Sequence, residues 1–389
     1  MDPPRLPGLC LPLRGRESYR TLGTAYAANT HRCVRCFWRD IRFCPQLRCG
    51  PLCRGYAPVF RWPIERCRAS TARRGFAFSR HSHGDVRPFP LASLMVDRIP
   101  LSGPAMRAYT SDHPCTWCDG CGNYGIWSAL KRALVELGID PWNVLLCFDV
   151  GCHGNMSDKI LGYRFHGLHG RVIPLAAGAK IANPELTVIA LGGDGASFSE
   201  GIGHLVHGIR SNYDITFILH NNANYGLTTG QASALTPQGQ PMNSSPEGIP
   251  ERTLNSMDFV FSLEPTFVAR GFSGAIPQLT TIFKAAIEHR GFSYVDVLQA
   301  CPTYNRFATH EYLMERCFDI AGEKYDAADL SRARALAVDT TGRIVTGVLY
   351  CQSAVPSFMH QLATRRAAQT TLVEEVGLRD VASLCSVFQ

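Results

Sequence analysis

The hydrophobic pattern of the chain becomes regular beyond about residue 105. Apolar residues in IWSALKRALVELGI return every three to four positions, which predicts a helix over 126–139. The next run, VLLCFDVG, is almost continuously apolar and predicts a buried strand over 144–151. The alternation continues with helices predicted over 171–183, 200–213 and 278–290, and with strands over 186–195, 214–222 and 292–301. Strands that alternate with helices predict an α/β fold with a doubly wound parallel sheet.

The segment that precedes this pattern differs in charge and composition. Residues 1–105 contain eighteen Arg, no Lys and six acidic residues, and this leader accounts for the formal net charge of +7. It shows no hydrophobic period beyond fragments such as FWRDIRF. A segment of this composition does not bury a core. We therefore expect a disordered extension, or a stretch translated from a start codon placed upstream of Met95 or Met106.

Three functional roles for the leader are also open. An Arg-rich arm can bind nucleic acid, an acid-poor Arg-rich segment can be a targeting peptide, and clustered cysteines can hold zinc. The candidate zinc ligands are Cys33, Cys36, Cys44, Cys49 and Cys53. These cysteines do not form two evenly separated pairs, so the spacing is not typical of a zinc site. The leader contains no Lys, so its composition is not typical of a nucleic-acid-binding arm.

Length and composition limit the remaining classes. The 389 residues, 46% of them hydrophobic, suffice for one large α/β domain with additions. No window reaches the roughly 18 apolar residues of a membrane span, and the N-terminus lacks the apolar stretch of a secretory signal. Sixteen cysteines in such a chain indicate free thiols or metal ligands. We therefore expect a soluble, cytoplasmic protein.

Residues 106–310 are expected to form the main domain, and 311–389 a C-terminal tail. In this tail the sequence predicts helices over 314–338 and a short strand in GRIVTGVLY. These elements are enough to dock on a partner but too few for a domain of their own.

Two of the predicted strands end in residues that suit a hard cation. One ends in Gly193-Asp194-Gly195 and the next in Asn221-Asn222. In a parallel βαβ unit both ends open at the same edge of the sheet, so a carboxylate and an amide oxygen can meet there around Mg²⁺. Glycines let the backbone approach a phosphate, and the start of the following helix favours negative charge. The pattern therefore predicts a metal-bound diphosphate.

Four cysteines lie where this sheet would bring them together. Cys118 and Cys121 precede the first helix, Cys152 follows the first strand, and Cys301 ends the strand over 292–301. Four thiolates with one close pair suit either zinc or a [4Fe–4S] cluster, and spacing alone allows both. The remaining cysteines of this part of the chain lack ligand spacing and are expected to be ordinary residues: Cys115, Cys147, Cys317, Cys351 and Cys385. His204 and His207, on a predicted helix, are likewise not expected to be catalytic.

The order of several motifs resembles a known family. GDG followed by a strand ending in NN resembles the diphosphate-binding motif of thiamine diphosphate enzymes. WCDGCGNYG, GCHGN, HGLHGR, GGDG, NNANYGLTTGQAS and CPTYN occur in the order seen in β subunits of 2-oxoacid:ferredoxin oxidoreductases, and the resemblance covers about residues 110–310. It implies the thiamine diphosphate-binding fold and oxidative decarboxylation of a 2-oxo acid, with coenzyme A as co-substrate. Since this chemistry releases electrons that a cluster can accept singly, it also implies [4Fe–4S] rather than zinc.

The resemblance assigns residues to each cofactor. It implies cluster ligation by Cys118, Cys121, Cys152 and Cys301, and Mg²⁺ ligation by Asp194, the Asn222 side chain and the Asn224 backbone carbonyl. It places the following residues near thiamine diphosphate: Gly151, Cys152, His153, Gly154, His169, Gly193, Asp194, Gly195, Ala196, Asn222, Asn224, Gly226, Leu227 and Thr228. It assigns no catalytic residue to this chain, because the activating glutamate is expected from a second subunit.

Departures from the family pattern bear on the substrate. Members acting on 2-oxoglutarate commonly carry a basic residue three positions after the third cysteine, where this chain has Asn155. Together with Leu227 at a pocket position, this favours pyruvate or another monocarboxylic 2-oxo acid, although His153 or Lys159 could supply a cation. Asn221 replaces the more usual aspartate before the Mg²⁺-binding Asn222, which should alter the surroundings of the metal without removing its site.

The expected partners follow from the same resemblance. An α subunit would supply the activating glutamate and contacts to coenzyme A, so we expect a hetero-oligomer that is inactive without it, with ferredoxin as electron acceptor and no membrane or nucleic-acid partner. Two alternatives are a non-oxidative thiamine diphosphate-dependent decarboxylase or carboligase subunit with structural zinc, and a zinc- or nucleic-acid-binding protein that works through its leader.

Overall fold

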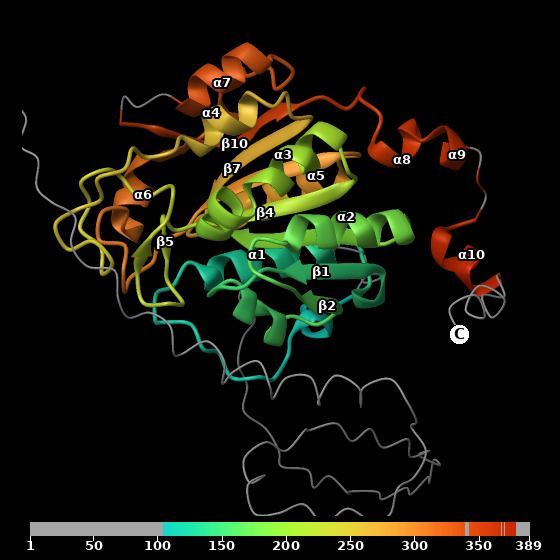
Figure 1. The fold of residues 1–389 in the computed structure, drawn as a ribbon, viewed down its shortest axis with the longest axis horizontal. Helices are drawn as coiled ribbons and strands as arrows, with labels where there is room; N and C mark the ends of the chain where they lie inside the picture. The colour runs from blue at the N-terminus through green and yellow to red at the C-terminus, as the bar shows by residue number, and fades with distance from the viewer. Residues whose placement is uncertain (1–103, 339–341, 367, 369, 379–389) are drawn as a thin grey trace, which may run out of the picture. The chain divides into compact units, whose positions relative to one another are not determined.

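A computed structural model of the chain describes residues 104–338, 342–366, 368 and 370–378. The predictions for the leader, including its five candidate zinc ligands and Met95, and the prediction for Cys385 lie outside these residues. The described residues build an eight-stranded sheet with helices packed on both faces (Figure 1).

The sheet is mostly parallel. Its strands are β1 (Val144–Phe148), β2 (Tyr163–His166), β3 (Thr187–Gly193), β4 (Ile215–Asn221), β7 (Phe267–Phe272), β8 (Phe292–Leu298), β9 (Cys317–Asp319) and β10 (Ile344–Cys351). They lie in the order β2-β1-β3-β4-β8-β7-β10-β9, and only the β7–β10 pair is antiparallel. The short strands β5 (Asn224–Tyr225) and β6 (Gln231–Ala232) form a separate antiparallel pair. The predicted parallel α/β sheet is confirmed.

The helices precede, connect and follow the strands of the sheet. They are α1 (Asn123–Glu136), α2 (Val172–Ala182), α3 (Ile202–Ser211), α4 (Ser256–Phe261), α5 (Ile276–Glu288), α6 (His310–Arg316), α7 (Leu330–Val338), α8 (Phe358–Gln361), α9 (Ala363–Arg366) and α10 (Leu372–Leu378). Among the described residues, no helix combines the length and the apolar character needed to cross a membrane.

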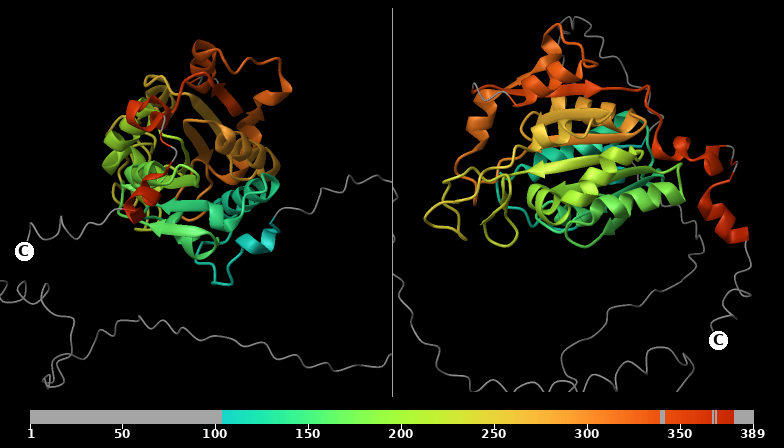
Figure 2. Two further views of the ribbon diagram at one scale, coloured as in Figure 1. Left: turned by 90° about the vertical axis from the view of Figure 1, so that its right-hand side faces the viewer. Right: turned by 45° about the horizontal axis from the view of Figure 1, so that its top comes forward.

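Alternating side chains of the central strands feed two hydrophobic cores. Ile189 and Leu191 of β3 pack with α1 and α5, whereas Val188 and Ala190 pack with α2, α3 and α4 on the opposite face. Figure 2 shows α2 and α3 on the face opposite α1. All four side chains are at most 3% exposed. Full burial of a large aliphatic side chain contributes about 1.5–3 kcal/mol to stability, so burial at these positions stabilises the packing of helices on both faces of the sheet.

The structure confirms most predicted elements and corrects others. The four strands predicted before residue 302 correspond to β1, β3, β4 and β8, and the four predicted helices to α1, α2, α3 and α5. The prediction of helices throughout 314–338 was partly wrong, because Cys317–Asp319 forms β9 against β10. The strand predicted in GRIVTGVLY is β10; it pairs with β7, so the expected tail contributes to the main sheet.

The direction of the strands determines where chemistry can occur. The carboxyl ends of β1, β3, β4 and β8 open at one edge of the sheet, because these strands are parallel. The cysteine turn before α1 reaches the same edge: the N–H of Gly122 donates to the carbonyl of Ala300 at 3.0 Å. Ligands of open α/β sheets bind at this edge.

Candidate cofactor and cluster site

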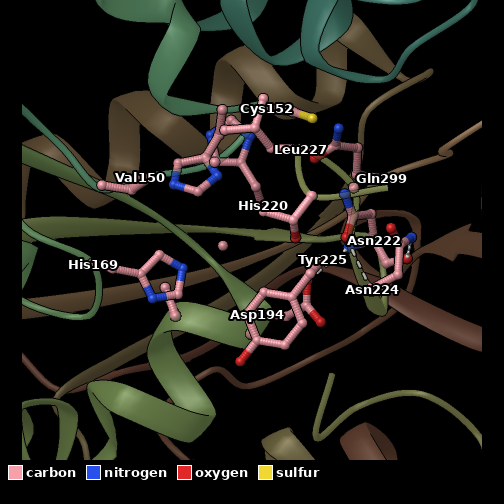
Figure 3. Close-up of a pocket in the computed structure, with 17 residues that line it drawn as sticks. Val150, Cys152, His169, Asp194, His220, Asn222, Asn224, Tyr225, Leu227 and Gln299 are labelled. Atoms are coloured by element: carbon pink, nitrogen blue, oxygen red, sulfur yellow. Dashed lines mark hydrogen bonds between the residues drawn. The ribbon is translucent and has the colours of Figure 1, made fainter. Parts of the chain in front are cut away.

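A pocket opens at the carboxyl edge of the sheet (Figure 3). It is lined by Val150, Gly151, Cys152, His153, His169, Gly193, Asp194, Gly195, Ala196, His220, Asn222, Asn224, Tyr225, Gly226, Leu227, Thr228 and Gln299. These include every residue expected near thiamine diphosphate except Gly154. A Cβ on Gly154 would lie 2.3 Å from the carbonyl oxygen of Asp149, so this glycine packs against the β1 loop.

Asp194 is the buried carboxylate of the pocket. It is 1% exposed, accepts a short hydrogen bond from the Ser233 hydroxyl, and lies 3.4 Å from the N–H of Asn222. Burial raises the pKa of Asp194 to about 7, although these hydrogen bonds oppose the shift. A carboxylate that burial destabilises is well suited to a divalent cation, which would favour its ionised form.

The Asn222–Asn224 turn lies beside this carboxylate. Ala223 has a φ of 52°, so the chain reverses sharply, and the Asn224 N–H donates to Oδ1 of Asn222 at 3.2 Å. Asn305 Nδ2 donates to the Asn222 carbonyl at 2.9 Å and fixes the turn from outside. Oδ1 of Asn224 is buried without a hydrogen-bond partner among the described residues. Oxygen atoms therefore gather next to Asp194, and this donor set fits Mg²⁺.

Two glycines let the backbone reach the pocket. A Cβ on Gly195 would lie 2.5 Å from the ring of Tyr225, and one on Gly193 would lie 2.9 Å from the ring of His153. Real Cβ atoms do not approach other atoms so closely, so neither position accepts a side chain without movement. The lack of a side chain at both positions lets these two rings lie directly against the backbone of the pocket, beside the helical turn that follows.

His169 and Tyr225 form an aromatic wall of the pocket. Their rings stack with centroids 5.9 Å apart, and both contact Glu200, with His169 Nδ1 at 3.3 Å and the Tyr225 hydroxyl at 3.3 Å from Oε2. The buried carboxylate of Asp149 accepts the N–H of Gly170 at 3.0 Å and so fixes the loop that carries His169. Burial raises the pKa of Tyr225 to about 12, so its hydroxyl remains a donor.

A second set of buried polar groups lacks partners. Nε2 of His153, Nε2 of His220 and Oε1 of Gln299 are buried without a hydrogen-bond partner among the described residues, and all three side chains line the pocket. The His153 and His220 rings lie 5.3 Å apart. Unsatisfied buried polar atoms in native proteins call for an explanation, and a bound polar ligand provides one.

The four cysteines predicted to act together lie close to one another and to the pocket. Burial raises the pKa of the Cys152 thiol to about 11, and the neighbouring thiols of Cys121, Cys301 and Cys118 add to the shift. The indole N–H of Trp117 donates to the Cys152 carbonyl at 2.7 Å and joins the cysteine turn to the β1 loop. Within the described ranges, no three His, Cys, Asp or Glu side chains are arranged to hold one metal ion. A cluster takes one thiolate per iron, so its ligands need not converge on one point.

Of the residues expected to influence the choice of substrate, some line the pocket and others do not. Leu227 lines it and is 47% exposed. Asn155 lies outside it and donates to the Thr116 hydroxyl at 3.0 Å, while the Lys159 ammonium donates to the His113 carbonyl. His153 is 6% exposed in the pocket wall, and burial lowers its pKa well below the usual value. Neither Asn155 nor Lys159 reaches the pocket in this structure.

Sequence reasoning missed several residues of the site. Val150, His220, Tyr225 and Gln299 line the pocket but were not predicted to. Each is adjacent to a predicted residue or within two positions of one, so their place at the strand ends was the available signal. Cys147 is buried in β1 as a core residue, as predicted.

Two family models match consecutive parts of the chain. The thiamine pyrophosphate enzyme, C-terminal TPP binding domain matches residues 149–297, which include most of the pocket. The C-terminal part of the pyruvate ferredoxin oxidoreductase beta subunit matches residues 301–366, beginning at Cys301.

A curated relative decides the family. The 2-oxoacid:ferredoxin oxidoreductase subunit beta of Saccharolobus solfataricus is 39% identical over 261 residues, which are 64% of this chain and 86% of the relative. The chain belongs to the β subunits of the 2-oxoacid:ferredoxin oxidoreductases. The predicted family and its enzyme class, thiamine diphosphate-dependent oxidoreductases, are confirmed. This β subunit is also similar to the 2-oxoglutarate synthase subunit KorB of Methanocaldococcus jannaschii, at 32% identity over 67% of this chain and 96% of the relative.

A solved structure supports the same assignment. It is a 2-oxoglutarate:ferredoxin oxidoreductase from Magnetococcus marinus with 2-oxoglutarate, coenzyme A and succinyl-CoA bound. One of its chains is 33% identical to this β subunit, with a TM-score of 0.66. The match covers 75% of this β subunit and 98% of that chain. The predicted thiamine diphosphate-binding fold is therefore confirmed.

Proposed function

We propose that this β subunit, joined to an α subunit, catalyses oxidative decarboxylation of a 2-oxo acid. The 2-oxo acid and coenzyme A give acyl-coenzyme A and CO₂, and two electrons pass singly through a [4Fe–4S] cluster to two ferredoxin molecules. Thiamine diphosphate, when bound, supplies the carbon nucleophile. The observation that carries the proposal is the double position of Cys152, which lines the cofactor pocket and belongs to the group of four thiols.

The chain's own residues would hold the cofactor and its metal. Asp194, the Asn222 side chain and the Asn224 carbonyl would bind Mg²⁺, and the bare backbone at Gly193 and Gly195 would lie against the diphosphate. The burial of Asp194, close to the Asn222–Asn224 turn, supports this arrangement. His169 and Tyr225 would close the side of the pocket and exclude water.

An α subunit is needed because the pocket offers no free carboxylate. Among the described residues that line it, Asp194 is the only acid, and its proposed role is to bind Mg²⁺. A thiamine enzyme needs a second carboxylate to activate the cofactor. We therefore assign that glutamate, and contacts to coenzyme A, to the α subunit; the names of the relatives, each a β subunit of a larger enzyme, support a hetero-oligomer.

The favoured substrate is a monocarboxylic 2-oxo acid such as pyruvate. Of the described residues that line the pocket, none is a lysine or an arginine, and Leu227 presents an apolar side chain. A second candidate is 2-oxoglutarate, because relatives include 2-oxoglutarate synthase subunits and the similar solved structure contains that compound. Its distal carboxylate would then need a cation from the α subunit.

The alternative within the thiamine enzymes is a non-oxidative decarboxylase or carboligase subunit with structural zinc. It would release product without coenzyme A or ferredoxin. The zinc- or nucleic-acid-binding alternative depends on the leader, which lies outside the described residues. The eight cysteines of the described chain are free thiols, which supports a place in the reducing cytoplasm.

The proposal is tested with the full chain co-purified with its α subunit under anaerobic conditions. Reduction of ferredoxin should require a 2-oxo acid and coenzyme A together, with pyruvate giving a higher kcat/KM than 2-oxoglutarate. Asp194→Ala should lower the rate about a hundredfold or more through loss of the metal. The surface variant Asp258→Ala, which loses only an exposed ion pair with Arg334, should keep the rate. Coenzyme A-independent product release without ferredoxin reduction would contradict the proposal.

A further inference from the structure

Gln299 lies between the cofactor pocket and the group of cysteines. It directly follows β8, is 2% exposed, and its backbone N–H donates to the Asn221 carbonyl at 2.8 Å. Its side chain lines the pocket on the same side as Asn222 and Asn224 (Figure 3). The roles described above make no use of this buried amide.

One end of the Gln299 amide contacts a cysteine. Nε2 donates to Sγ of Cys121 at 3.6 Å. The contact depends on close packing: a Cβ on Gly122 would lie 2.7 Å from Cγ of Gln299 and 2.5 Å from the Ser273 hydroxyl. The Gly122 N–H donates to the carbonyl of Ala300, which holds the cysteine turn against Gln299. Glycine at position 122 is therefore what allows the amide to reach the sulfur.

The other end of the amide faces His220 and the pocket. Oε1 of Gln299 is buried without a partner among the described residues, as is Nε2 of His220. Nδ1 of His220 is 2.9 Å from Oδ1 of Asn123. A cysteine sulfur that is bound to a cluster as a thiolate can only accept a hydrogen bond, so Nε2 is the end of the amide that would meet the sulfur.

The bond to sulfur has an electrostatic consequence. An N–H donor at 3.6 Å from a sulfur stabilises negative charge on that sulfur. A reduced cluster carries one more negative charge than an oxidised one. A donor to a ligand sulfur therefore favours the reduced form, and such hydrogen bonds are among the factors that set cluster potentials.

We propose that Gln299 is a positioning residue that raises the reduction potential of the cluster through its N–H···S bond to Cys121. This inference rests on the proposed function, because it requires Cys121 to be a cluster ligand. It adds a specific claim, namely that the residue lining the cofactor pocket beside Asn222 also adjusts how readily the cluster accepts an electron.

The test compares Gln299→Leu with the full wild-type chain after anaerobic cluster loading. Gln278→Leu serves as a matched control. Gln278 is a partly buried glutamine that donates to the Thr346 hydroxyl at 2.9 Å and does not line the pocket. The midpoint potential is measured by reductive titration followed by electron paramagnetic resonance. Gln299→Leu should make the cluster harder to reduce, by up to about tenfold in the equilibrium constant or ~59 mV for a one-electron couple, while Gln278→Leu matches the wild type.

The outcomes separate this inference from the proposed function. A wild-type chain that takes up no iron would refute the cluster itself, and with it the inference. A loaded Gln299→Leu variant with the wild-type potential would refute the inference alone. If Gln299→Leu does not load, Gln299→Glu keeps the size of the side chain and replaces the donor with a carboxylate; its potential should be lower still, and an unchanged value would equally overturn the inference.

Discussion

At the scale of single residues, the buried carboxylate of Asp296 explains why an asparagine stands at position 221, beside the proposed metal site. Asp296 is fully buried on β8, where Arg270 Nε lies 3.1 Å from Oδ2 and Asn221 Nδ2 donates to Oδ1 at 2.9 Å. Asn221 directly precedes the proposed metal ligand Asn222. An amide at position 221 satisfies Asp296, whereas an aspartate would set a half-buried carboxylate against the fully buried carboxylate of Asp296. The departure from the family's usual aspartate thus has a structural reason.

This arrangement predicts the effect of restoring the aspartate. Asn221→Asp should lower the free energy of unfolding by about 1–3 kcal/mol at pH 7, because it replaces a buried hydrogen bond by like-charge repulsion. The double variant Asn221→Asp, Asp296→Asn exchanges the two groups and should recover part of the loss. Urea unfolding of the three proteins measures both effects; equal stability of Asn221→Asp and the wild type would show that the pair is not coupled.

A buried histidine predicts how stability depends on pH. His289 is 7% exposed, its Nε2 lies 3.0 Å from the Thr266 hydroxyl, and burial lowers its pKa while Asp214 opposes the shift. Between the lowered pKa and the unfolded value of about 6.5, the unfolded chain binds more protons, so stability falls as pH drops through this range. Thermal unfolding should show a smaller loss between pH 7 and pH 5.5 in His289→Gln than in the wild type. The same pH dependence in both proteins would assign it to other groups.

At the scale of elements, the apolar runs of the central strands made the sheet predictable. β3 and β4 are buried on both faces, so their sequences are almost continuously hydrophobic. β2 is an exposed edge strand, and β7 contains Arg270, whose charge is compensated by Asp296 on the neighbouring strand. Neither has an apolar run for a sequence pattern to detect. β9 depends on its pairing with β10, a contact that local sequence does not encode.

Close packing of α1 against the turn after β7 gives a test at this scale. A Cβ on Gly125 would lie 1.8 Å from the backbone carbonyl oxygen of Ser273, so Gly125→Ala must displace backbone and should destabilise the protein by about 1–3 kcal/mol. Gly178, in α2, has no atom within 4 Å of such a Cβ, and Gly178→Ala should be neutral or stabilise by about 0.5–1 kcal/mol. Melting temperatures compare the two; similar values would contradict the described contact of α1.

At the scale of the whole molecule, one edge of the sheet collects a cofactor pocket and a group of thiols from segments far apart in the sequence. Asp194 and Asn222 could be predicted as neighbours because the order of parallel strands brings them together. The four cysteines were likewise expected at this edge. Tyr225 and Gln299 were not predicted, because a position near a strand end does not by itself show that a side chain lines the pocket.

The proposed function depends above all on an iron–sulfur cluster at this edge of the sheet, beside the thiamine pocket. The most direct measurement is iron, zinc and sulfide analysis of the full chain, purified without oxygen, together with its visible absorbance before and after dithionite. Cys152→Ser tests a proposed ligand, and Cys115→Ser, a thiol of the same cysteine-rich stretch as Cys118, is the control.

We expect about four iron and four sulfide per chain, with a broad absorbance that bleaches on reduction. Both should be lost in Cys152→Ser and kept in Cys115→Ser. One zinc per chain without sulfide would contradict the proposed iron–sulfur cluster and would favour a non-oxidative thiamine enzyme.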